Sequence, residues 1–274
     1  MYINGEWLET EEKMAVINPA NGEIVQYVSL VGKEETREAI KAAKAAFPAW
    51  SGLTGTKRSH YLSKVVEKFE EKKEFLAETI TREMGKSIHH ARFEVKSTIE
   101  FFKWYAEEAR RVYGEVLPIP APHKRANVIK QPVGVVGAIT PWNFPLQMGA
   151  RKLGAALAVG CTVVFRPSRE APLSSVELFK VFDEVGIPNG VVNLVIGGST
   201  EIVGELMASS DVRKISFTGS TEVGKKLIRQ SADTVKRVSM ELGGHAPLIV
   251  FDDADIDLAV KGTIASKFAS TGQQ

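Results

Sequence analysis

Apolar segments of strand length alternate with segments of helical periodicity between residues 133 and 251. The short apolar runs are typical of buried strands, and the segments between them repeat apolar residues at helical spacing. The predicted strands are Val133–Thr140, Thr162–Arg166, Val191–Val195, Lys214–Phe217, Lys236–Glu241 and Ala246–Phe251, and the predicted helices are Leu146–Val159, Ser174–Val185, Glu201–Ala208 and Glu222–Ser231. This alternation predicts an α/β fold with a doubly wound, mostly parallel sheet, in which ligands bind at the carboxyl ends of the strands.

The first 113 residues predict three short strands followed by a block of helices. Asn4-Gly5 and Asn21-Gly22 are turn signals between the strands. The strands are Ile3–Trp7, Met14–Asn18 and Glu23–Ser29, and the helices are Lys33–Trp50, Lys57–Lys72, Lys73–Met84 and Ser87–Tyr113. We expect the glutamates and arginines of the last helix to form a solvated face, opposite an apolar stripe that includes Phe93, Val95, Ile99, Phe102 and Tyr105.

Between these two regions, Val116–Pro120 and Ala126–Gln131 are predicted to be extended segments around a turn that contains proline. A ribbon of this kind projects easily from a domain. It could pair with another subunit, or it could form an edge hairpin of its own domain.

The composition is that of an ordinary globular protein, with 274 residues, 44% hydrophobic and 25% charged. A net charge of +2 gives no global field for nucleic acid or an anionic membrane, so we expect neither as a partner. The weakly polar run Leu153–Phe165 is too short to span a bilayer, and the first residues lack the pattern of a signal peptide. With Cys161 as the single cysteine there is no internal disulfide, and we expect a cytoplasmic location. No set of metal ligands is identified.

Glu241 is a carboxylate between Met240 and Leu242, followed at once by Gly243-Gly244. Burial among apolar neighbours would suit a general base, because it favours a carboxylate that accepts a proton at neutral pH. The glycines let the backbone or a ligand approach closely. The alternative is a glutamate that simply ends a strand before a turn.

A turn stiffened by two prolines, Pro141-Trp142-Asn143-Phe144-Pro145, follows the strand Val133–Thr140. An Asn carboxamide held in this way can donate a hydrogen bond to a developing oxyanion, an interaction worth about 3 kcal/mol in such sites. Alternatively, Asn143 caps the helix that follows. We expect that helix to begin at Phe144 and to carry Arg151-Lys152 near Asn143, although a solvated Arg-Lys pair has the same sequence.

Two segments are candidates for binding phosphate. Arg166 and Arg169 would lie near one strand end, where Arg169 would favour a ribose 2′-phosphate, although surface charge is the alternative. The segment Thr218–Lys226 resembles a P-loop, but Lys226 stands where that motif needs a Ser or Thr to hold magnesium. The pair Gly219-Ser220 at a helix start remains a candidate anion site, and an ordinary capped helix would have the same residues.

Several motifs in one order resemble the signatures of the aldehyde dehydrogenase superfamily. They are Thr140–Pro145, Arg166–Ser168, Phe217–Gly224, Glu241–Gly244 and Gly272-Gln273. The stretch Arg151–Thr162 is most similar to succinate-semialdehyde dehydrogenases. The resemblance implies a Rossmann-like dinucleotide-binding domain at 1–113 and 133–243, an oligomerisation ribbon at 114–132, and the start of a catalytic domain at 244–274.

The resemblance also implies NAD(P)-dependent oxidation of an aldehyde, with succinic semialdehyde as the expected substrate, through a cysteine thioester. Asn143 would hold the oxyanion, Glu241 would activate the hydrolytic water, and Lys152 would lie near the active centre. Arg151 would meet the substrate's distal carboxylate, and Phe144 would be a second substrate-binding residue. The implied cofactor is NADP, with NAD as the alternative, and the residues implied to bind it are Trp142, Arg166, Ser168, Arg169, Gly219, Ser220 and Leu242.

The chain departs from the family pattern in two places. His245 replaces the usual Asn after the Glu-Leu-Gly-Gly motif, and the family's nucleophilic cysteine would be the residue after Gln274. We expect Cys161 to be a buried structural thiol, and the chain by itself to be inactive. The alternatives are a noncatalytic fragment that binds a nucleotide or serves assembly, and a P-loop NTPase. Full-length members of the family commonly form homo-oligomers, so the resemblance implies a homo-oligomer for the full-length protein.

Overall fold

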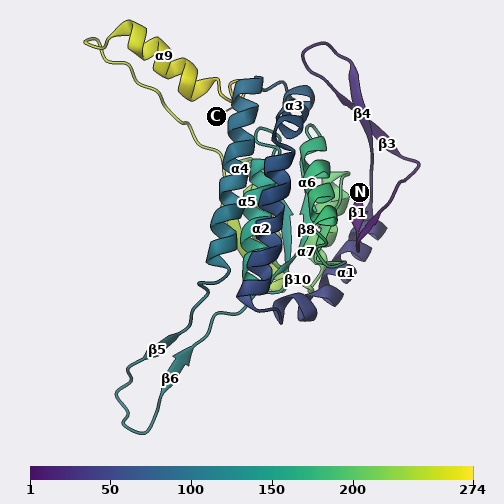
Figure 1. Ribbon diagram of the computed structural model, residues 1–274, viewed down its shortest axis with the longest axis vertical. Coiled ribbons are helices and arrows are strands. Elements are labelled where there is room, and N and C mark those ends of the chain that lie inside the picture. The colour runs from purple at the N-terminus through teal and green to yellow at the C-terminus, as the bar shows by residue number, and fades with distance from the viewer. Residues whose placement is uncertain (274) are drawn as a thin grey trace.

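The computed structural model describes residues 1–273, and within them one mixed sheet forms the centre of the molecule (Figure 1). Its strand order is β11-β10-β7-β8-β9-β1-β2. The bounds are β1 Tyr2–Ile3, β2 Glu6–Trp7, β7 Val135–Ile139, β8 Thr162–Arg166, β9 Val192–Leu194, β10 Val212–Thr218 and β11 Arg237–Glu241. The five strands from β11 to β9 are parallel, and β1 and β2 add an antiparallel edge. The predicted doubly wound, mostly parallel sheet is confirmed.

Helices cover both faces of this sheet. The bounds are α1 Lys33–Ser51, α2 Gly55–Glu71, α3 Lys73–Met84, α4 Ile88–Glu108, α5 Gln147–Val159, α6 Leu173–Glu184, α7 Ser199–Ala208 and α8 Thr221–Ser231, with a 3-10 turn at Ala232–Thr234. Consecutive strand residues alternate between two buried clusters, as Val163 and Phe165 belong to one and Val164 to the other. The first cluster packs against α2 to α6, and the second against α1, α7 and α8. The central strands β7 and β8 are therefore buried on both sides, which explains their continuous apolar sequences.

Two of the predicted elements in the first 113 residues have wrong bounds. The predicted strand Ile3–Trp7 is broken into β1 and β2 because Asn4 and Gly5 both have positive φ, at 53° and 84°, and form a hairpin turn. The fourth helix ends at Glu108 rather than at Tyr113. The strands β3 Lys13–Ile17 and β4 Ile24–Ser29 pair as a separate hairpin.

Phe93 does not belong to the buried stripe of α4, since it is 67% exposed. It lies two residues before the buried Val95, which corresponds to a rotation of about 200° around the helix. Glu94, in contrast, is buried although the sequence placed the glutamates of this helix on a solvated face. It falls at helical spacing with Ala91 and Thr98, which are buried as well.

The ribbon between α4 and β7 is an antiparallel pair that extends away from the body of the molecule (Figure 1). Its strands, β5 Glu115–Leu117 and β6 Ala126–Val128, are shorter than the predicted segments. They expose the apolar side chains of Val116 and Val128.

The predicted strand Ala246–Phe251 does not form, because no neighbouring strand pairs with it among the described residues. The segment leaves the edge strand β11 and leads to α9, Ile256–Lys267, which the sequence did not predict (Figure 1). Asp255 caps this helix, and none of its residues is buried. The chain then returns to the body, where Ser270 is buried.

Candidate functional site

A cavity of about 1230 Å³ extends along β10 and β11 and reaches the carboxyl ends of β7, β10 and β11. The turn after β7, one side of α5, the start of α8 and the end of β11 line it. Nine of the residues predicted to form the site contribute to the lining: Trp142, Asn143, Phe144, Arg151, Lys152, Gly219, Ser220, Glu241 and Leu242. The carboxyl ends of the strands form the edge at which parallel α/β sheets bind their ligands.

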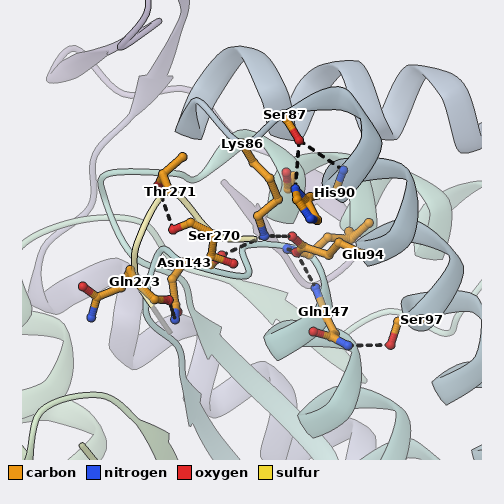
Figure 2. Close-up of polar contacts among 12 residues, drawn as sticks. Lys86, Ser87, His90, Glu94, Ser97, Asn143, Gln147, Ser270, Thr271 and Gln273 are labelled. Carbon is orange, nitrogen blue, oxygen red and sulfur yellow. Dashed lines mark hydrogen bonds and ion pairs between the residues drawn. The ribbon is translucent and has the colours of Figure 1, made fainter. Parts of the chain in front are cut away.

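Asn143 lies in the turn between β7 and α5, with its side chain directed at the returning C-terminal segment (Figure 2). Its Nδ2 donates a hydrogen bond of 3.2 Å to the carbonyl oxygen of Gln273, and its buried Oδ1 has no partner within residues 1–273. The expectation that the helix begins at Phe144 is wrong, because α5 begins at Gln147. Asn143 is therefore neither its cap nor on the same helix as Arg151.

The turn is held in place by a buried ion pair between Lys86 and Glu94 (Figure 2). Their side chains are 1% and 0% exposed. Lys86 Nζ also donates to the backbone carbonyl of Asn143 at 2.9 Å, and Glu94 accepts from the backbone N–H of Leu146 at 3.0 Å. Burial lowers the pKa of Lys86 and raises that of Glu94, while the attraction within the pair opposes both shifts.

Lys152 extends from α5 to the middle of the sheet edge, where its Nζ donates to Ser216 Oγ at 3.1 Å. Burial lowers its pKa to about 8, an effect that Glu241 opposes and Arg151 reinforces. At neutral pH this ammonium is thus much closer to losing its proton than an ordinary lysine. Lys152 thus brings a titratable hydrogen-bond donor into the cavity that Asn143 and Glu241 also line.

Glu241 ends β11 next to Thr218 of β10, and Gly219 N–H donates to its backbone carbonyl at 3.1 Å. Its side chain is exposed, so the expected burial is wrong. The reason is that β11 is an edge strand and the apolar residues after it leave the sheet. The carboxylate faces the open cavity and remains near enough to Lys152 to influence its pKa.

Helix α8 begins at the cavity wall with Ser220 as its N-cap, whose Oγ accepts from Val223 N at 3.3 Å. Gly219 has no room for a side chain, since a Cβ would lie 2.5 Å from the ring of Phe217. A Cβ on Gly224 would lie 2.4 Å from Leu242, so the helix packs closely on this cavity residue. Lys226, the residue that departs from a P-loop, pairs with Glu222.

Arg166, Ser168 and Arg169 lie at the end of β8 and do not line the cavity. Arg166 donates to Ser199 Oγ at 2.6 Å at the start of α7, and its buried Nε has no partner within residues 1–273. Burial lowers the pKa of this guanidinium. Ser168 is hydrogen-bonded to Glu170, and Arg169 extends to Met14 of β3.

The model of the aldehyde dehydrogenase family matches residues 7–274, which is nearly the whole chain. The chain belongs to the aldehyde dehydrogenase family. As a member, it is 49% identical over 274 residues to glutarate-semialdehyde dehydrogenase of Pseudomonas putida, with 99% of the chain and 57% of that relative covered. It is 50% identical to a mitochondrial succinate-semialdehyde dehydrogenase of Arabidopsis thaliana, of which it covers 52% while 99% of the chain is matched.

Solved structures agree with this membership. The crystal structure of an Escherichia coli NADP-dependent enzyme has a TM-score of 0.96 and 47% identity, with 100% of this aldehyde dehydrogenase chain and 57% of that one covered. Succinate-semialdehyde dehydrogenase from Burkholderia pseudomallei has the same TM-score of 0.96 at 44% identity, with 100% and 57% covered. The chain thus spans about half the length of the relatives it matches.

Cys161 of this family member is buried at the start of β8, as expected for a structural thiol. Burial raises its pKa, so the reactive thiolate is disfavoured. In the part of the chain that the structure describes, no group of acidic, His or Cys side chains could hold a metal ion. Within the same residues, no helix is long and apolar enough to cross a membrane.

Sequence reasoning missed Lys86, Glu94 and Ser216, all of which act on the site from other elements. For Glu94 a signal was present, because it shares the helical spacing of the buried residues of α4. Lys86 and Ser216 carry no such signal. Their significance depends on contacts with residues more than 50 positions away.

Proposed function

We propose that this chain is the dinucleotide-binding part of an enzyme that oxidises a short aldehyde with a distal carboxylate to the corresponding acid. The observation that carries the proposal is the convergence of Asn143, Lys152 and Glu241 on one cavity at the carboxyl edge of the sheet. Relatives named for succinic and glutaric semialdehydes support this substrate class. Succinic semialdehyde is the proposed substrate, with NADP as the cofactor and NAD as the alternative.

The residues at the strand ends fit a phosphate-bearing dinucleotide. The buried Nε of Arg166 lacks a partner among the described residues, and the capped start of α8 presents backbone N–H groups to the cavity. Trp142, Gly219, Ser220 and Leu242 would line the nicotinamide half, and Arg166, Ser168 and Arg169 the adenosine half. NADP is favoured because Arg169 is an exposed guanidinium, which suits a 2′-phosphate. When bound, the dinucleotide supplies the hydride acceptor.

Three side chains of this chain would act on the reacting groups. Asn143 donates its Nδ2 hydrogen to the oxyanion that develops on the substrate, a contribution of about 3 kcal/mol in such sites. Glu241 takes a proton from the water that releases the acid, and its exposure gives that water access. Lys152, with its pKa of about 8, stabilises negative charge that develops in the cavity lined by all three side chains.

Arg151 would hold the distal carboxylate of the substrate. It lines the same cavity as Asn143 and lies on α5, the helix that follows the Asn143 turn. Its guanidinium lies 5.2 Å from the centre of the Phe101 ring. This stacking orients a planar fork that matches a carboxylate. Phe144 lines the same cavity and would contact the carbon chain of the aldehyde.

We further propose the division of the chain that the family resemblance implies. Residues 1–113 and 133–243 form the dinucleotide-binding domain, 114–132 the oligomerisation ribbon, and 244–274 the start of a catalytic domain. The exposed apolar side chains of the ribbon, such as Val116 and Val128, support a role in subunit pairing.

The 274-residue chain alone is proposed to bind the dinucleotide without turnover. Its single cysteine, Cys161, is buried with a raised pKa and cannot act as the nucleophile. Calorimetric titration of the purified chain with NADP should give saturable binding, and a mixture with succinic semialdehyde should give no reduced dinucleotide. Thiol-dependent reduction by this chain would contradict the second part of the proposal.

The activity itself is tested in a chimera that joins residues 1–274 to the remaining part of the Pseudomonas putida relative. We expect the chimera to reduce NADP when supplied with succinic semialdehyde. A folded chimera that binds NADP but oxidises no aldehyde would refute the proposed reaction. The same relative, unaltered, is the positive control.

A further inference from the structure

Lys86 and Glu94 form the most deeply buried ion pair in the described residues, with side chains 1% and 0% exposed. Lys86 precedes α4 and Glu94 lies on it. Neither residue lines the cavity, and the proposed reaction uses neither. A buried pair of this kind contributes little net stability, because removing two charges from water costs about as much as their attraction returns.

The two charges hold the turn after β7 at its middle and at its end (Figure 2). Lys86 Nζ donates to the backbone carbonyl of Asn143 at 2.9 Å and lies 3.9 Å from the centre of the Phe144 ring. On the other side of the turn, Glu94 Oε1 accepts from the backbone N–H of Leu146 at 3.0 Å and of Gln147 at 3.2 Å.

Helix α5 depends on this carboxylate for its first turn. Its N-cap, Leu146, has no side chain that could accept a hydrogen bond from the helix. Glu94 supplies the missing acceptor from another helix, and its negative charge lies at the positive end of the helix dipole. Gln147 is held further by its side-chain hydrogen bond to Ser97 Oγ, at 2.5 Å.

We propose that Lys86 and Glu94 are positioning residues, which together fix the backbone from the carbonyl of Asn143 to Gln147 and so orient the side-chain amide of Asn143 into the site. Between the two anchored ends lie only Phe144 and Pro145, and the ring of Pro145 restricts the backbone further. From this backbone the side chain of Asn143 extends toward the C-terminal segment, where Nδ2 donates to the carbonyl of Gln273. The catalytic consequence rests on the proposed function, whereas the geometry does not.

The test compares two double variants that each replace one ion pair by apolar residues of similar size. Lys86→Met with Glu94→Leu removes the buried pair and leaves no unpaired charge, so the fold should be retained. Lys103→Met with Glu100→Leu is the matched control, because that pair also involves α4 but is exposed, at 43% and 60%. Lys86→Met alone is a second variant, which removes the hydrogen bond to the carbonyl of Asn143 and leaves the Glu94 acceptor in place at the start of α5.

Two measurements on the 274-residue chain decide the matter. In the buried-pair variant, hydrogen exchange of the Leu146 and Gln147 amides should accelerate at least about tenfold while Leu157 in the same helix stays protected. The side-chain amide signals of Asn143 in a nitrogen–proton correlation spectrum should shift or broaden, and they should stay unchanged in the control. Unchanged Asn143 signals in the buried-pair variant, or in Lys86→Met if the double variant does not fold, would overturn the proposal.

In the chimera, the misplaced Asn143 amide should lower kcat for succinic semialdehyde at least about tenfold and leave KM within about twofold. The reason is that the hydrogen bond from Asn143 to the oxyanion is made in the transition state. An equal loss in the exposed-pair control would mean a general destabilisation and would overturn the positioning role. A chimera without any activity would refute the proposed function, while the exchange and spectral results on the chain would still decide the role of Lys86 and Glu94.

Discussion

The side-chain amide of Asn143 donates a hydrogen bond of 3.2 Å to the backbone carbonyl of Gln273, a residue 130 positions further along the chain. The amide donor is thus directed at an oxygen atom in the structure itself. A developing oxyanion in the same place would receive the same hydrogen.

Replacing this donor should slow the reaction without unfolding the chain. Asn143→Asp keeps the shape of the side chain but puts a carboxylate oxygen where Nδ2 now donates, and we expect kcat of the chimera to fall by about 10²–10³. Steady-state kinetics with succinic semialdehyde measure the loss, and NADP titration of the chain serves as the control. A kcat within about twofold of the parent would refute the role of Asn143.

Lys152 should titrate near pH 8 in the folded protein. The carbon-detected signal of its side chain should show a midpoint of about 8. The comparison is Lys103, an exposed lysine whose hydrogen bond to Glu100 raises its pKa above the ordinary value, so its signal should not titrate near pH 8. Because the folded pKa of Lys152 lies below the unfolded one, the unfolded chain binds more protons between these values. The free energy of unfolding contributed by this group therefore rises with pH from about 8 to about 10.4.

Lys152→Met removes the titrating group, so its unfolding free energy should rise less over that pH window than that of the parent. Urea unfolding at a series of pH values provides the measurement. An identical pH dependence in both proteins would contradict the lowered pKa of Lys152.

Ser220→Ala should destabilise the chain and weaken dinucleotide binding. The hydroxyl caps α8 through Val223 N, and loss of an N-cap costs about 1 kcal/mol. Thr54→Ala removes the equivalent cap of α2, far from the start of α8, and is the matched control. Both variants should lose similar stability in urea, but only Ser220→Ala should lose affinity for NADP; equal affinities would exclude Ser220 from the cofactor site.

Arg169 should distinguish NADP from NAD. Its guanidinium is exposed and hydrogen-bonds to the sulfur of Met14, a weak acceptor, so it is available for a 2′-phosphate. In Arg169→Ala we expect NADP affinity to fall about tenfold and NAD affinity to change little. Arg213→Ala is a charge-matched control, because Arg213 lies at the amino end of β10 whereas Arg169 follows the carboxyl end of β8. Equal losses for both dinucleotides would remove Arg169 from the 2′-phosphate site.

Arg151→Leu should affect substrates according to their charge. In the chimera, kcat/KM for succinic semialdehyde should fall about 100-fold, the loss expected when a charged hydrogen-bonding partner is removed. For an uncharged aldehyde such as butanal the loss should be small. Equal losses on both aldehydes would mean that Arg151 does not recognise the distal carboxylate.

The sequence by itself determined the order of strands and helices in the sheet region and the residues that gather at its carboxyl edge. Strands such as Thr162–Arg166 are apolar on both faces, and helices such as Lys73–Met84 keep one apolar stripe, so each pattern identifies its element locally. The family motifs follow strand ends, and parallel strands end at one edge. Asn143 and Glu241 therefore meet there although 98 positions separate them in the numbering.

Tertiary structure alone decided which of these charges are buried and what each one touches. Glu241, predicted to be buried, is exposed on an edge strand, while Glu94, predicted to be solvated, lies in the core beside Lys86. The apolar run Ala246–Phe251 has the composition of a strand but finds no neighbour to pair with. Periodicity records the preference of a segment for one conformation, whereas burial and pairing depend on distant segments that local sequence does not encode.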